Sequence, residues 1–79
     1  MSWNYRVISR TVDGETFYTI HEVYYDDNND IEVYSTEPMY PCGNDIEELM
    51  GDIDYFGEAL SEPVLKWEEL PSNKGEEDE

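Results

Sequence analysis

The chain has 79 residues, of which 21 are Asp or Glu and 4 are Lys or Arg, so its formal net charge is −17 at neutral pH. This length allows one domain with a thin core. The charge argues against direct binding to nucleic acid or to an anionic membrane, and it favours a basic partner, most strongly at low salt. We expect one compact acidic domain over residues 1–71 and a disordered acidic tail over residues 72–79.

Composition also predicts the class and location of the protein. Apolar residues make up 38% of the chain, which is enough for a small core and too much for a fully disordered chain. No apolar run approaches the roughly 18 residues of a membrane span, and no signal peptide precedes Trp3. Cys42 is the single cysteine, which excludes an internal disulfide and indicates a reducing compartment. We therefore expect a cytoplasmic protein.

Three segments rich in β-branched and aromatic residues predict strands, at residues 3–10, 16–25 and 31–36. Asp13-Gly14 lies between the first two and is a strong hairpin signal. The polar sequence DDNND, residues 26–30, predicts the next turn. These segments predict a three-stranded antiparallel β-meander.

Residues 44–60, NDIEELMGDIDYFGEAL, predict one amphipathic helix that ends before Pro63. Asn44 is expected to be the N-cap, with Glu47 completing a capping box. Apolar residues recur every three or four positions, so we expect one stripe packed on the sheet: Ile46, Leu49, Met50, Ile53, Phe56 and Leu60. Residues 64–70 predict a short C-terminal strand or a strap anchored by Trp67. The expected fold class is α+β.

The predicted helix carries six carboxylates and neither Lys nor Arg. Like-charge pairs four residues apart, such as Glu48 and Asp52, each cost a few tenths of a kcal/mol. A helix selected for stability alone would include Lys. A helical wheel places two rows of carboxylates beside Tyr55 on the outermost strip. The candidate partner-binding residues are Glu47, Glu48, Asp52, Asp54, Tyr55 and Glu58.

Rows of carboxylates can imitate the phosphates of DNA, which carries about one negative charge per 1.7 Å of helix axis. The leading hypothesis is a non-enzymatic acidic protein-binding module, an inhibitor that mimics nucleic acid towards a basic, nucleic-acid-binding protein. The compact acidic character is similar in type to phage and mobile-element inhibitors, including anti-restriction and anti-CRISPR proteins. An acidic surface that only keeps the protein soluble is the plainer interpretation.

Two further hypotheses come from other residues. Aromatic residues lie on both faces of the second strand, so a homodimer could bury the spare face. Asp26, Asn28, Asp30 and Glu37 occupy positions 1, 3, 5 and 12 of an EF-hand-like loop, so calcium binding through residues 26–37 is a second alternative. Ile31 stands where that loop needs Gly, and strands, not helices, are expected on either side of it. His21 and Cys42 have no partner group at a spacing typical of metal ligands or a catalytic pair. Apart from the calcium alternative, we predict no enzyme activity, cofactor or metal site.

The segments SWNYRVI, IHEVYYDD, IEEL, EAL and EPVLKWEEL together resemble a family of short bacterial proteins. Members of that family begin Ser-Trp-Asn-Tyr-Arg-Val and end with a Pro-Val-Leu segment. The resemblance covers most of residues 2–70 and is most distinctive over residues 2–8 and 20–26. It implies one compact α+β domain and carries over neither an activity nor a cofactor nor a site.

Overall fold

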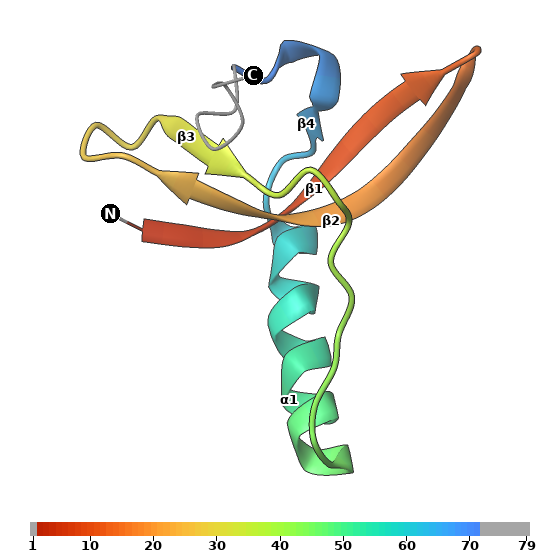
Figure 1. Cartoon of the computed structure of the whole chain (residues 1–79), viewed down its shortest axis with the longest axis vertical. Coiled ribbons are helices and arrows are strands. Elements are labelled where there is room, and N and C mark those ends of the chain that lie inside the picture. The colour runs from red at the N-terminus through yellow and green to blue at the C-terminus, as the bar shows by residue number, and fades with distance from the viewer. Residues whose placement is uncertain (1, 72–79) are drawn as a thin grey trace.

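The computed structural model describes residues 2–71, which form a curled sheet with one α-helix (Figure 1). The expected acidic tail, residues 72–79, lies outside the described residues. The helices of residues 2–71 include none that is long and apolar enough to cross a membrane. In chain order the elements are β1 (Ser2–Val12), β2 (Glu15–Tyr25), β3 (Ile31–Tyr34), α1 (Ile46–Gly57), the 3-10 helix η1 (Glu58–Ser61), β4 (Leu65–Lys66) and the 3-10 helix η2 (Trp67–Glu69).

The sheet has four strands in the order β3-β2-β1-β4. β1 pairs antiparallel with β2, and β2 pairs antiparallel with β3. β4 pairs parallel with β1, through Ile8 opposite Leu65 and Ser9 opposite Lys66. The α+β class is confirmed, but the sheet is mixed and four-stranded, so the three-stranded antiparallel meander was wrong. The short C-terminal element joins the free edge of β1, where its two residues find unpaired backbone groups.

The β1–β2 hairpin turns at Asp13 and Gly14, as the sequence predicted. Asp13 has φ 53° and Gly14 has φ 84°, and a two-residue turn with both φ values positive matches the twist of the flanking strands. Val12 pairs with Glu15 directly across this turn. The hairpin extends well beyond the other two strands (Figure 1).

One face of the sheet is covered by the C-terminal segment. Ile8, Val23 and Tyr34 form a buried cluster there, and partly buried side chains close it: Tyr25, Ile31, Leu65, Trp67 and Leu70. The ring of Trp67 meets the ring of Tyr34 edge-on at 5.6 Å, and the Arg10 guanidinium lies 3.7 Å from the Trp67 ring centroid. Trp67 therefore anchors the C-terminal segment as predicted.

The C-terminal end of the helical region packs on the other face of the sheet. Phe56 is buried and stacks on Tyr5 with ring centroids 4.2 Å apart, and Ala59 is fully buried. The rest of α1 projects away from the sheet beside the segment that precedes it (Figure 1). Ile46, Met50, Ile53 and Leu60 are exposed, so the prediction that the whole apolar stripe packs on the sheet was wrong.

The start of α1 also differs by one residue from the prediction. Asp45 is the N-cap, and its side chain accepts a hydrogen bond from the backbone N–H of Glu48 at 2.8 Å. The Glu48 carboxylate in turn accepts from the backbone N–H of Asn44 at 2.9 Å. The first half of a capping box is therefore supplied by Asp45 where Asn44 was expected, and the third helical residue is Glu48 where Glu47 was expected. Its carboxylate bonds to the residue before the N-cap and not to the N-cap itself.

His21 is buried in β2 and fully hydrogen-bonded. Its Nδ1 lies 2.8 Å from the carbonyl oxygen of Ser35, and its Nε2 lies 2.7 Å from Thr19 Oγ1. A carbonyl oxygen can only accept, so Nδ1 carries the proton and Nε2 accepts from the Thr19 hydroxyl. Burial lowers the pKa of His21, the hydrogen bond to Ser35 opposes this shift, and the nearby positive charge of Arg10 lowers the pKa further.

We expect acid to destabilise the protein through His21. A histidine whose pKa is lower when folded contributes stability above its unfolded pKa of about 6.5, and that stability is lost as the pH falls. Between about pH 7 and pH 5.5, above most carboxylate titration, the free energy of unfolding should fall more for wild type than for His21→Gln. Urea unfolding across this range measures both slopes, and equal slopes would contradict the assignment of a neutral buried imidazole.

Candidate functional site

An open hollow of about 670 Å³ lies between α1, the segment that precedes it and the β1–β2 hairpin. We call it the acidic hollow. It contains every partner-binding residue predicted from the sequence except Glu47. Its lining residues are Tyr5, Glu22, Met39, Tyr40, Cys42, Glu48, Gly51, Asp52, Asp54, Tyr55 and Glu58.

Backbone hydrogen bonds fix the walls of the acidic hollow. The N–H of Met39 donates to the carbonyl of Ile20 at 2.8 Å, which ties the preceding segment to β2. The N–H of Cys42 donates to the Asp52 carboxylate at 2.9 Å, which ties the same segment to the middle of α1. Asp52 therefore holds the helix against this segment while its carboxylate lines the hollow.

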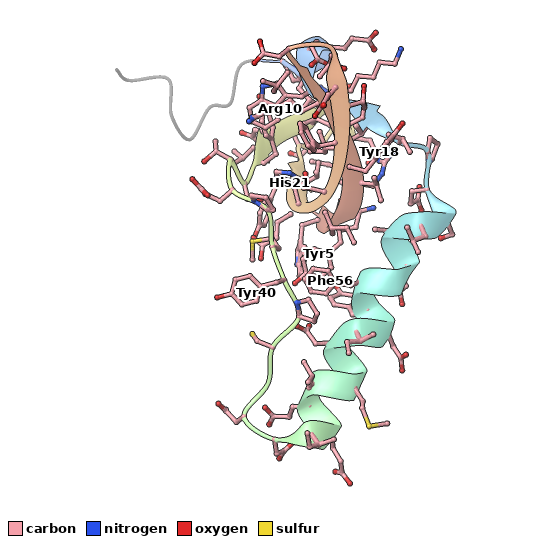
Figure 2. The ribbon with its side chains drawn as sticks, turned by 90° about the vertical axis from the view of Figure 1, so that its right-hand side faces the viewer. Tyr5, Arg10, Tyr18, His21, Tyr40 and Phe56 are labelled. Atoms are coloured by element: carbon pink, nitrogen blue, oxygen red, sulfur yellow. The ribbon has the colours of Figure 1, made fainter. Side chains whose placement is uncertain are left out.

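Aromatic rings form the end of the acidic hollow nearest the sheet. Tyr55 meets Trp3 and Tyr5 edge-on, with centroids 5.7 and 5.2 Å apart. Tyr40 projects from the preceding segment on the side opposite α1 (Figure 2) and is 75% exposed. Tyr55 thus contacts the sheet, and the prediction that it lies on the outermost strip of the helix was wrong.

The charged side chains that line the acidic hollow are all negative. Five carboxylate side chains line it, and its lining contains neither Lys nor Arg: Glu22, Glu48, Asp52, Asp54 and Glu58. Burial raises the pKa of Tyr5, and the negative charges of Asp52 and Glu22 raise it further. Removing a proton from Tyr5 would add another negative charge to the hollow. A bound cation would instead offset the repulsion among these groups.

A second hollow of about 290 Å³ adjoins the first. Tyr5, Tyr55 and Glu58 line both, and Trp3 and Glu62 are added in the second. Trp3 stacks on Tyr24 at 5.8 Å, so this hollow also combines aromatic rings with carboxylates. The two hollows together form a continuous strip of aromatic and acidic groups along the end of α1.

Six lining residues of the acidic hollow were not predicted as site residues from the sequence, and three of these carry aromatic or acidic groups. Tyr5 and Glu22 are directly opposite each other in the β1–β2 register, and Tyr40 comes from the segment between β3 and α1. The hairpin signal could have paired Tyr5 with Glu22, because a two-residue turn at Asp13-Gly14 sets the register. Nothing in the sequence pattern brings Tyr40 to the same place.

The Asp26–Glu37 segment forms a polar turn. Asp26 Oδ1 accepts from the backbone N–H groups of Asn28 and Asp30, at 2.9 and 3.0 Å, as expected of an Asx side chain in a turn. Across residues 2–71, no group of three or more His, Cys, Asp or Glu side chains is placed to hold a metal ion. Calcium binding by this segment stays a prediction.

The aromatic residues of β2 are unevenly covered. Val23 is fully buried, whereas Phe17 and Tyr18 are exposed towards the tip of the hairpin. A homodimer through this surface stays a prediction.

Cys42 is exposed and lines the acidic hollow.

The chain was compared with protein families, curated proteins and solved structures. No family profile matches it, and no curated protein or solved structure is significantly similar to it.

Proposed function

We propose that this chain is a non-enzymatic acidic protein-binding module, and that the acidic hollow receives an arginine side chain of a basic protein partner. The observation that supports this is the combination of five carboxylates with three tyrosines around one open hollow whose lining has no basic residue. Carboxylates alone would favour any cation. Tyrosines beside them favour a cation whose flat, weakly hydrated face can stack on an aromatic ring.

Arginine fits this combination better than lysine does. The guanidinium group is planar, is less strongly hydrated than an ammonium group, and stacks on aromatic rings while its edge donates hydrogen bonds to carboxylates. Tyr40 and Tyr55 supply exposed rings, at 75% and 40% exposure. Glu48, Asp52 and Glu58 line the same hollow and supply hydrogen-bond acceptors.

The finer form of this proposal is an inhibitor that mimics nucleic acid. A basic surface that grips phosphates presents Arg and Lys side chains at close spacing. The net charge of −17 would draw such a surface to this chain at a distance. A partner that binds nucleic acid is therefore expected to be released from the chain by duplex DNA and by salt.

The proposal is tested with a fluorescent nona-arginine peptide and two charge-matched double variants. Asp52→Asn with Glu58→Gln removes two carboxylates from the acidic hollow. Glu15→Gln with Glu47→Gln removes two exposed carboxylates that do not line it. We expect the first pair to weaken binding by roughly fivefold to tenfold relative to the second, since only the first loses contacts with a stacked guanidinium.

Fluorescence anisotropy at physiological salt measures both affinities, and circular dichroism checks that both variants are folded. A nona-lysine peptide serves as the control ligand and should show a smaller difference between the two pairs. In wild type, the bound peptide should also lower the pKa of Tyr5, because its positive charge offsets Asp52 and Glu22. Equal affinities of the two pairs for nona-arginine would refute the role of the hollow and leave only long-range attraction.

A further inference from the structure

An aliphatic face that runs along α1 and into η1 is exposed, and no part of residues 2–71 covers it. Ile53 is 49% exposed and Leu60 is 74% exposed, with the others between these values. We call this face the aliphatic seam; it consists of Ile46, Met50 and Ile53 of α1 and Leu60 of η1. A monomeric protein this small and this polar has little reason to present four large aliphatic side chains in one row.

The residues of the aliphatic seam are spaced like the contact residues of a helix that packs against another helix. Its positions are 46, 50, 53, 57 and 60, alternating by four and three residues, which is the spacing of the apolar seam in a coiled coil. Position 57 is Gly57, where a Cβ atom would have nothing within 4 Å. A neighbouring helix could therefore approach closely at that point.

The charges beside the aliphatic seam indicate which kind of molecule would bind there. On a helical wheel Glu47, Asp54 and Glu58 form a row along one edge of the seam, and α1 has neither Lys nor Arg. A second copy of this chain would bring two such rows together, with −17 on each molecule. Residues 72–79, SNKGEEDE, contain no aliphatic or aromatic side chain that could fill the seam. A helix with apolar side chains on one side and cationic side chains beside them would match both the apolar row and its acidic border.

We propose that the aliphatic seam binds an amphipathic helix of a basic protein partner. The apolar side chains of that helix would pack on Ile46, Met50, Ile53 and Leu60, and its Lys or Arg side chains would pair with Glu47, Asp54 and Glu58. This inference rests on the proposed function only in taking the partner to be basic. The acidic border of the seam shares Asp54 and Glu58 with the acidic hollow, but none of the four aliphatic side chains lines the hollow, so the seam can be altered without changing the hollow.

Two synthetic peptides of about 18 residues, long enough to form a helix on binding, test the inference. The first has Leu at the seam positions of each heptad and Lys elsewhere, and the second has the same composition in an order without periodicity. Met50→Gln with Ile53→Gln makes the seam polar and keeps good helix formers. Val12→Thr with Val64→Thr alters two exposed apolar residues elsewhere. Anisotropy titrations measure each combination.

We expect wild type to bind the periodic peptide roughly tenfold more tightly than the aperiodic one, because only the periodic peptide buries apolar surface on the seam. The seam variant should lose this preference, and the Val12/Val64 variant should keep it. Equal binding of the two peptides by wild type would overturn the inference, while the nona-arginine result would still stand for the hollow. Self-association of wild type that the seam variant abolishes would also overturn it, since a second copy would then be the occupant.

Discussion

Replacing Ile8 by Ala is expected to destabilise the protein by about 2–5 kcal/mol, whereas the same change at Ile53 should alter stability by less than about 0.5 kcal/mol. Ile8 is 1% exposed and lies in the cluster with Val23 and Tyr34, so its truncation leaves a cavity. Ile53 is 49% exposed on the aliphatic seam, and Ala is a better helix former than Ile. A total stability of only 5–15 kcal/mol is usual for a domain, so the change at Ile8 removes much of it.

Urea unfolding of the two variants, followed by circular dichroism, measures both values. The pair compares the same chemical change at a buried and at an exposed site. A loss at Ile53 as large as that at Ile8 would mean that the seam is covered in the free protein, contrary to the observed orientation of α1. If Ile8→Ala abolishes folding altogether, Ile8→Val, which removes one methylene, should still destabilise the protein measurably.

Adding a methyl group at Gly43 is expected to destabilise the protein by about 1–3 kcal/mol, and adding one at Gly51 should stabilise it by about 1 kcal/mol. A Cβ atom at Gly43 would lie 2.5 Å from the backbone nitrogen of Leu49 and 2.8 Å from Glu48 atoms. These are largely backbone atoms of the first turn of α1 and cannot move aside alone. At Gly51 the added atom would meet nothing within 4 Å, and Ala in place of Gly lowers the entropy that the helix loses on folding.

Thermal unfolding of Gly43→Ala and Gly51→Ala gives melting temperatures that should move in opposite directions. A change of 1 kcal/mol corresponds to roughly 4–8 °C for a domain of this size. A neutral or stabilising Gly43→Ala would show that the segment before α1 does not lie close against the first helical turn. The walls of the acidic hollow would then be looser than the hydrogen bond from Cys42 to Asp52 implies.

Local signals in the sequence predicted the elements well. The Asp13-Gly14 turn, the two long strands and the helix are all present, because hairpin chemistry and helical periodicity act over a few residues. Residues 64–70 were expected to form a short strand or a strap, and β4 has two residues there, but a segment so short carries no signal of the strand with which it pairs. This long-range pairing accounts for the mixed sheet.

The orientation of α1 could not be derived from its periodicity. A wheel shows where the apolar residues gather, but it does not show which side of the helix the rest of the chain covers. Here the preceding segment bonds to Asp52 through Cys42, and Phe56 packs on Tyr5. The helix is therefore held by its acidic and aromatic side, and its aliphatic side is left exposed. Because the acidic side of the helix faces the rest of the chain, most of the predicted acidic residues lie in one hollow with Tyr5 and Tyr40.

The parallel pairing of β4 with β1 also sets an order in which the chain can fold. The residues that it joins, Ile8 and Leu65, lie near opposite ends of the described chain, and the Arg6 side chain donates to the Pro63 carbonyl across 57 residues. During synthesis, the hairpin and α1 leave the ribosome before Trp67 does. One face of the sheet, with Ile8 and Val23, therefore stays uncovered until residues 65–70 emerge. The nascent protein is most open to premature association in that interval, when its own negative charge is its main protection against it.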